Sequence, residues 1–236
     1  MVSIFKREFF SYFNSPLGYV FLTAFYFFSG MFFYVFVLVH NSTRIGMICE
    51  NMFQIVLFVV PIITMRLLSE EKRQKTDQVL LTSPISLTSV VYGKFLAACS
   101  ILAIGTAVTL IYAFVISAFS VSSLNWLEIF GNILGLLLLG GAMISVGLFI
   151  SALTESQVVA AVSTFAVSIG LLFVEMLSSG LNNEIITTII NGISFSGRYR
   201  EFTQGIFNIS NFLYFISVIV IFNFLTVRII EKRRWA

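Results

Sequence analysis

The sequence SEEKRQKTDQVLLTSPIS, residues Ser69 to Ser86, lies between two long apolar segments in a chain of which only 11% of the residues are charged. A helix needs roughly 20 apolar residues to cross the hydrocarbon core of a bilayer, and apolar runs of about that size flank this stretch. The charged stretch is therefore expected to be a water-exposed connection between two membrane spans. A short tether of this kind favours docking on another protein.

The composition of the whole chain indicates a membrane protein. Of 236 residues, 58% are hydrophobic and 16% aromatic, and the mean hydropathy is +0.98. Soluble domains are typically about half apolar and about a quarter charged. The fold class expected from these values is an all-α polytopic membrane protein.

Six apolar runs qualify as transmembrane helices. The second is short and contains Pro61, which predicts a kink, and the third is long enough to project beyond the bilayer. No cleavable signal peptide pattern is present, so the first run is expected to be retained. The runs are approximately Leu17–Val39, Met52–Leu68, Val91–Phe119, Ile129–Leu153, Val158–Leu177 and Phe212–Ile230.

The distribution of Lys and Arg predicts the orientation. Of the 14 basic residues, 11 fall on one side of the predicted spans and three on the other. Basic residues concentrate on the cytoplasmic side, so both termini and Ser69–Ser86 are expected in the cytoplasm of a multi-pass inner or plasma membrane protein. The first group is Lys6, Arg7, Arg66, Lys72, Arg73, Lys75, Lys94, Arg228, Lys232, Arg233 and Arg234, and the second is Arg44, Arg198 and Arg200.

Residues 1–16 have an amphipathic pattern and form the first of two predicted regions, the second being the six-span domain 17–236. Phe5, Phe9 and Phe13 share one helical face, and Lys6 and Arg7 lie on another. This pattern is typical of a helix that lies in the membrane interface. The alternative is a solvated cytoplasmic tail.

The fourth span has small residues at a spacing of four. Small residues allow close approach of helix backbones within a membrane. The pattern predicts tight packing, either within one subunit or against a second copy. The residues are Gly131, Gly135, Gly141, Ser145, Gly147 and Ser151.

Residues 178–211, between the last two spans, are rich in isoleucine and glycine. They predict two short helices that dip into, or lie on, the outer interface, the second around Arg200–Phe207. An ordinary structured outer loop is the alternative.

The sequence lacks the motifs of several functional classes. The sequence has no Gly-rich phosphate loop, no zinc motif and no nucleophile elbow, so no catalytic residue, metal or cofactor is expected. Nucleic acid is not an expected partner. Cys49 and Cys99 are predicted to be unpaired. The spans contain almost no central carboxylates, so energy for transport would come from elsewhere.

The charged stretch itself has a helical pattern. Ser69 could cap a helix, Glu70 and Glu71 suit its first turn, and Pro84 would end it. Leu80 and Leu81, with Val79, form an apolar knob suited to a groove on another protein. The alternative is a solvated loop whose basic residues only fix topology.

This stretch and several other segments together resemble the signature of ABC type-2 permeases, especially the gliding-motility-associated branch. The loop signature is fairly specific, and the resemblance covers essentially the whole chain. Relatives often have Gly before the Thr and Glu after it, whereas this chain has Lys75 and Asp77 on either side of Thr76. The register in which this segment aligns with its relatives therefore stays open. The matching pieces are Met65–Thr76, Leu80–Ser86, Gly93-Lys94, Lys6–Phe9, Ser15–Tyr19, Phe202 with Gly205-Ile206, and Tyr214-Phe215.

The resemblance implies a non-enzymatic half-transporter that dimerises and docks on cytoplasmic ATPase subunits through a coupling loop at 69–88. Membrane lipids surround such a protein, and the apolar, aromatic composition favours amphipathic cargo. The alternatives are a membrane anchor or sensor that recruits a cytoplasmic protein and a membrane-embedded lipid-modifying enzyme. The residues implied to carry coupling are Glu70, Glu71, Arg73, Thr76, Leu80, Leu81 and Pro84.

Overall fold

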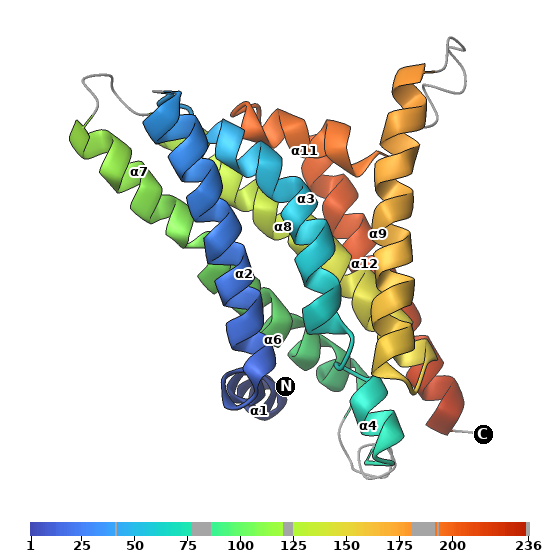
Figure 1. The fold of residues 1–236 in the computed structure, drawn as a ribbon. Coiled ribbons are helices and arrows are strands. Elements are labelled where there is room, and N and C mark those ends of the chain that lie inside the picture. Colours follow the sequence, from blue (N-terminus) through green and yellow to red (C-terminus); the bar gives the residue numbers. More distant parts are fainter. Residues whose placement is uncertain (41, 77–85, 120–124, 181–191, 193, 235–236) are drawn as a thin grey trace.

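The computed structural model describes residues 1–40, 42–76, 86–119, 125–180, 192 and 194–234, with backbone alone for 174–180 and 234. These residues form helices and no strand (Figure 1). The helices are α1 (Val2–Asn14), α2 (Pro16–Phe33) continuing into the π-helical turn η1 (Tyr34–Val39), α3 (Gly46–Thr64), α4 (Ser69–Arg73), α6 (Leu87–Thr106), α7 (Val108–Phe119), α8 (Trp126–Leu153), α9 (Gln157–Gly180), α11 (Phe195–Thr203) and α12 (Ile209–Arg234).

The predicted all-α membrane fold is confirmed. In the described part of the chain, five helical segments are long and apolar enough to cross a bilayer, and α9 contributes a shorter apolar stretch, Gln157–Phe173. The second span begins at Gly46, earlier than the predicted Met52, because polar residues at its start are tolerated beside α11. The third span consists of two successive helices, α6 and α7, that meet at Ala107.

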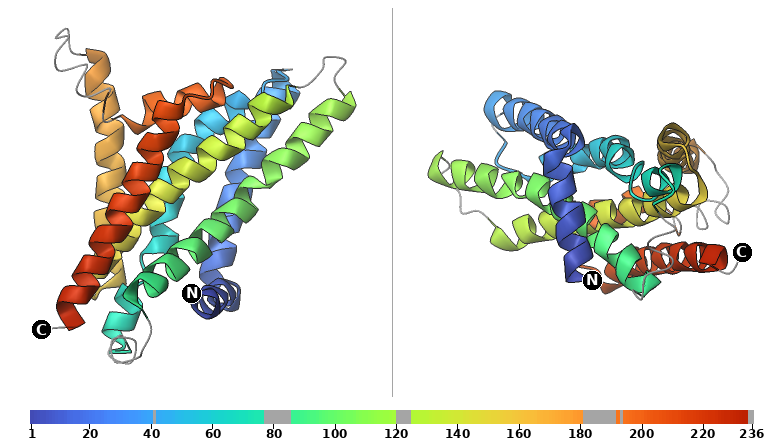
Figure 2. Two further views of the ribbon diagram at one scale, coloured as in Figure 1. Left: turned by 180° about the vertical axis from the view of Figure 1, so that it is seen from behind. Right: turned by 90° about the horizontal axis from the view of Figure 1, so that it is seen from below.

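Helix α8 is the centre of the bundle and contacts α3, α6, α9, α11 and α12 (Figures 1 and 2). Its small residues lie at these contacts. A Cβ atom on Gly135 would lie 2.8 Å from Cβ of Phe202, and one on Gly141 would lie 3.3 Å from Cδ1 of Ile219. Gly131 faces the backbone of α11 in the same way. The glycines therefore set how closely α11 and α12 approach α8.

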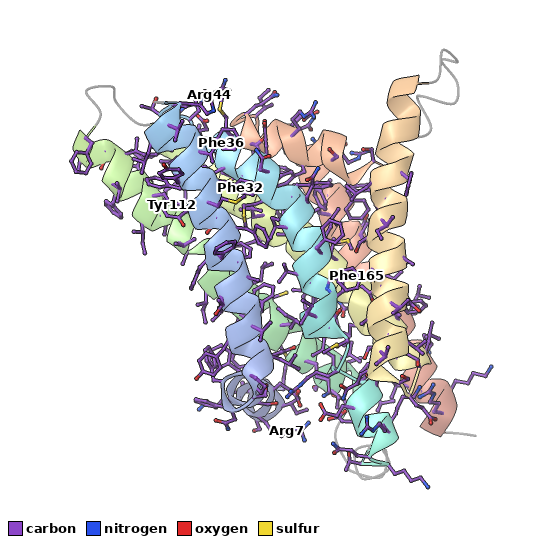
Figure 3. All side chains as sticks on the ribbon, viewed as in Figure 1. Arg7, Phe32, Phe36, Arg44, Tyr112 and Phe165 are labelled. Atoms are coloured by element: carbon purple, nitrogen blue, oxygen red, sulfur yellow. The ribbon has the colours of Figure 1, made fainter. Side chains whose placement is uncertain are left out.

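The two ends of the bundle differ in charge. We call the end that carries α1, α4 and the last turns of α12 the basal end, and Figure 1 shows all three there. Helix α11 lies at the opposite end, and Figure 3 shows Arg7 at the basal end and Arg44 at the opposite one. The basic residues that the sequence assigned to one side thus gather at one end.

Helix α11 closes the end of the bundle opposite the basal end. It covers Phe195–Thr203, so the helix predicted around Arg200–Phe207 begins and ends earlier in the chain. The Tyr199 hydroxyl donates to the Cys49 carbonyl at 2.6 Å, and the Thr203 hydroxyl donates to Glu50 at 3.0 Å. These bonds fix α11 to α3. The first predicted helix of 178–211 falls largely outside the described residues.

Candidate functional site

The candidate site lies where α4 meets the basal end of the bundle. Helix α4 follows α3 after a turn at Met65–Leu68 and has Glu70 and Glu71 in its first turn and Arg73 in its last. It ends at Arg73, and Lys75 has a φ of 57°, the left-handed conformation that stops a helix. Three predicted coupling residues, Leu80, Leu81 and Pro84, lie outside the described residues.

Four charged side chains from three helices meet beside α4, and we call them the basal ion cluster: Arg7 and Glu8 of α1, Glu71 of α4 and Lys94 of α6. The Lys94 ammonium lies 2.9 Å from Glu71 Oε1 and 3.2 Å from Glu8 Oε1. Arg7 Nη2 lies 3.0 Å from Glu71 Oε1 and 2.7 Å from Glu8 Oε1. Each carboxylate is therefore held by both cations, and α1, α4 and α6 are joined at one point.

Burial makes this cluster different from a surface ion pair. Only 2% of the Lys94 side chain is exposed, against 54% for Arg7. A buried ammonium is tolerated only when it is paired and hydrogen-bonded. Lys94 therefore depends on Glu8 and Glu71 far more than Arg7 does, and the interaction of Arg7 is weakened by solvent.

Glu8 gives the cluster a pH dependence. Burial raises the pKa of its carboxyl, but Lys94 and Arg7 outweigh burial, so the net pKa is lowered from 4.5. Such a group stabilises the fold above its unfolded pKa, and this stabilisation is lost as pH falls through the folded pKa. We expect the melting-temperature difference between wild type and Glu8→Gln, measured in detergent, to be largest near neutral pH and to shrink below pH 4.5.

Glu155→Gln is the matched control for this experiment because Glu155 is exposed in the turn between α8 and α9. The melting-temperature difference between Glu155→Gln and wild type should be small at every pH. A Glu8→Gln difference that stays constant from neutral pH to well below pH 4.5 would contradict the lowered pKa of Glu8.

Arg66 makes a second link between α1 and the start of α4. Its Nη2 donates to Ser11 Oγ at 2.6 Å, and its Nε lies 3.4 Å from Glu70 Oε2. Its guanidinium also lies 5.9 Å from the ring centre of Tyr12, whose hydroxyl donates to the Ile63 carbonyl at 3.3 Å. Helix α1 is thus attached to both the end of α3 and α4.

Ser151 attaches the same segment to α8. Its hydroxyl oxygen accepts from the backbone N–H groups of Leu68 and Ser69, each at 3.0 Å, and Lys72 Nζ donates to the Ala152 carbonyl at 3.0 Å. The predicted capping role of Ser69 is wrong. Its buried hydroxyl donates back to the Met65 carbonyl instead, and Ser151 takes the place of a local cap.

A polar cleft of about 350 Å³ lies between α1 and α4 beside the cluster. Its lining includes Ser11, Gln74 and Thr76 together with the charged groups already described. Gln74 and Thr76 are exposed, whereas Arg73, also exposed, does not line the cleft. The cleft is not enclosed and is lined by charged and polar groups, so it can receive polar groups of another molecule.

The structure brings some predicted residues together and separates others. Arg7 and Glu71 meet in the cluster, and Glu70 pairs with Arg66, whereas Lys6 is exposed. The aromatic residues of the predicted interfacial face form a row along α1. Phe5 and Phe9 have ring centres 5.8 Å apart, and those of Phe9 and Phe13 are 5.2 Å apart.

Glu8, Arg66 and Lys94 were not among the predicted site residues. The signal for Lys94 was present in the sequence, since it is a lone cation within the predicted third span. Glu8 follows Ile4 and precedes Tyr12 at helical spacing, and both of those residues are buried. Ser151 was predicted to pack helices, but its hydrogen bonds to the turn before α4 had no sequence signal.

No metal centre is found in the part of the chain that the structure describes, because no three His, Cys, Asp or Glu side chains there are close enough to hold an ion. Both cysteines are free, Cys49 buried and Cys99 half-buried.

Comparison with known proteins assigns the family. The model of the ABC-2 family transporter protein matches residues 37–235, which is most of the chain. A comparison with curated proteins found no match. The matched region begins in η1 and includes α4, Lys94 and Ser151, while α1 and α2 precede it. The chain therefore belongs to the ABC-2 transporter family and is a membrane-spanning permease component of an ABC transporter.

Proposed function

We propose that this chain is one half of a dimeric, ATP-driven exporter and that α4, with the segment after it, binds a separate cytoplasmic ATPase. In this proposal both termini and the basal end lie in the cytoplasm of a cell membrane. The proposal includes membership of the gliding-motility-associated branch, and the residues of the loop signature, Met65–Ser86, support it. The observation that carries the proposal is the buried ion cluster that joins α4 to α1 and α6.

The contacts of α4 suit it to transmit motion. A rigid link is needed if closure of the ATPase is to move the spans, because a flexible loop would absorb the displacement. Glu71 links α4 to Lys94 of α6, and Ser151 links the preceding turn to α8. A displacement of α4 would therefore reach several spans at once, and the ATPase could favour one of two arrangements of the bundle.

The exposed side of α4 supports a protein partner. Arg73, Gln74, Lys75 and Thr76 are all exposed at the basal end, while Ser69 and Leu68 are buried against the bundle. Helix α4 and the residues after it thus have one side packed against the bundle and one side exposed. Charged and polar groups on the open side would set the register of the ATPase.

The open face of α3 supports a second subunit. Glu50 and Gln54 lie one turn apart on this helix and are exposed, and Phe58, one turn further, is 41% exposed. A polar pocket of about 130 Å³ lies beside them against Tyr199 and Arg200. Polar groups facing lipid are costly, so a second copy or a water-filled pathway would cover this face.

Substitution in the apolar knob tests docking directly. Leu80→Asp or Leu81→Asp should abolish co-purification of the ATPase, because burial of each leucine would contribute about 1.5–3 kcal/mol to binding. Membrane insertion should be unchanged. Ser3→Asp adds the same charge at the basal end, on an exposed residue of α1 outside the docking segment, and it should retain the ATPase. Normal recovery of the ATPase with both leucine variants would contradict docking through the knob.

ATP turnover separates transport coupling from anchoring. The ATPase reconstituted with this permease in vesicles should hydrolyse ATP faster than the ATPase alone. If the two bind but turnover is unchanged, with or without candidate amphipathic cargo, the chain is an anchor for the ATPase and the coupling proposal fails.

A further inference from the structure

A groove of about 470 Å³ lies between the start of α6 and the last turns of α12, at the basal end. The left view of Figure 2 shows the side of the bundle along which α12 descends to this end. The groove is separate from the cleft beside the basal ion cluster, with which it shares no lining residue. None of the residues named above as carrying ATPase coupling lines it, although the coupling loop at 69–88 ends at its edge.

The deeper part of the groove is apolar and open to the membrane. Val220 and Phe224 of α12 are 50% and 52% exposed, although both lie within a membrane-spanning helix. Val227 of α12 and Tyr92 of α6 also line the groove and are half-buried. Apolar side chains exposed at this depth face hydrocarbon, so a lipid acyl chain can lie along them.

The end of the groove is polar and basic. Arg228 lines it with a side chain that is 61% exposed, and its guanidinium lies 5.0 Å from the ring centre of Phe224. Arg228 Nη1 pairs with Glu231 at 2.8 Å. Because a guanidinium has five N–H donors, this pair leaves donors for a second anion.

The opposite wall is the first turn of α6, where Ser86 and Thr88 are exposed. First-turn N–H groups have no partner within their own helix, and they favour negative charge. Arg228 and these N–H groups line the same groove, so a cation and a positive helix terminus meet at its end. The basic end thus complements an anionic head group, and the apolar wall complements its acyl chain.

We propose that this groove is a binding site for an anionic phospholipid from the leaflet at the basal end. Its phosphate lies between Arg228 and the first turn of α6, and an acyl chain extends along Phe224 toward Val220. The site depends on the membrane location of the chain and not on the proposed coupling to an ATPase. Loss of lipid binding and loss of ATPase docking are therefore measured separately.

Native mass spectrometry of the purified full chain in a neutral detergent tests the site. After delipidation, the protein is titrated with phosphatidylglycerol or with phosphatidylcholine of the same acyl chains. We expect phosphatidylglycerol to be retained preferentially and Arg228→Gln to weaken its binding about tenfold. Glu231→Gln should strengthen it, because the competing carboxylate is removed. A merely structural role of the Arg228–Glu231 pair would not give opposite effects.

Lys232→Gln is the matched control, since Lys232 is an exposed cation on the same helix and does not line the groove. It should change binding less than twofold. Equal retention of the two lipids, or equal effects of Arg228→Gln and Lys232→Gln, would overturn the proposal in favour of non-specific surface charge. Inorganic phosphate at millimolar concentration should not displace the lipid, and displacement would show that the groove binds phosphate rather than lipid.

Thr88→Trp gives a second test if the arginine variant does not fold. Thr88 lines the groove and is exposed, so the larger side chain fills the site without entering the protein core. Its melting temperature should resemble that of wild type, while retention of phosphatidylglycerol falls to the level of phosphatidylcholine. Undiminished preference for phosphatidylglycerol in this variant would contradict the site.

Discussion

Lys94→Met is expected to lower the free energy of unfolding by about 3–5 kcal/mol and to abolish ATPase stimulation. The substitution leaves Glu8 and Glu71 without the buried cation that lies 3.2 Å and 2.9 Å from them, respectively. Arg7 cannot replace it fully, because its side chain is 54% exposed. Stability is measured by denaturant titration of the detergent-solubilised permease, and coupling by ATP turnover of the reconstituted complex.

Two variants separate charge balance from mechanical linkage. Lys94→Arg retains the cation and should keep most of both stability and stimulation. The double variant Glu8→Gln/Lys94→Met removes one charge of each sign and leaves the pair Arg7–Glu71 at 3.0 Å. It should recover much of the stability, since replacing a complete buried ion pair costs less than breaking it.

Stimulation of the ATPase should stay low in the double variant, because α4 has lost its direct link to α6. A double variant with wild-type stimulation would show that the cluster stabilises the bundle without transmitting motion. Docking of the ATPase should persist in both Lys94 variants, since the exposed side of α4 is unchanged. Loss of docking in Lys94→Arg would contradict the division between the two sides of α4.

The membrane fold could be predicted from the sequence because its signals are local. Apolar runs of about 20 residues indicate spans and their approximate limits, and five of the six predicted runs correspond to described helices long enough to cross a bilayer. The break between α6 and α7 at Ala107 was not predicted, although Gly105 and Thr106, two weak helix formers, directly precede it. The predicted limits of α11 differed from the observed ones, because contacts with α3 hold this helix in place and its own sequence pattern does not define its ends.

The sequence identified two of the four residues of the basal ion cluster. Glu71 and Arg7 were chosen because they lie in short segments with a clear pattern, but their partners Glu8 and Lys94 are 63 and 23 residues away from Glu71. Pairings over such separations depend on how helices pack, which the linear pattern does not specify. A lone Lys inside an apolar run indicates that a carboxylate must be near, and the fold shows which two carboxylates they are.

Gly147→Ala is expected to destabilise the permease by about 1–3 kcal/mol, although alanine is the better helix former. A Cβ atom at this position would lie 2.6 Å from Cβ and 2.9 Å from Cγ2 of Thr64, and its contact with the Thr64 hydroxyl would be closer still. Thr64 cannot rotate away freely, since it is fully buried and its hydroxyl donates to the Val60 carbonyl at 3.2 Å. Helices α3 and α8 would therefore have to separate.

This separation would displace the turn that leads into α4. Thr64 is the last residue of α3, directly before that turn. The contacts of Ser151 with Leu68 and Ser69 lie one turn beyond Gly147 on α8. Gly170→Ala is the matched control. A Cβ there meets nothing within 4 Å, so this variant should be neutral or gain about 0.5–1 kcal/mol from helix propensity.

The double variant Gly147→Ala/Thr64→Gly removes every atom that the new methyl group would meet most closely. If steric contact between α3 and α8 is the cause, the double variant should be more stable than the sum of the two single effects predicts, and the coupling energy of the cycle should exceed about 1 kcal/mol. Additive effects would instead mean that Gly147 contributes through α8 alone. Because the turn at Met65–Leu68 depends on this spacing, ATPase stimulation should follow stability through the cycle, falling in Gly147→Ala and recovering in part in the double variant.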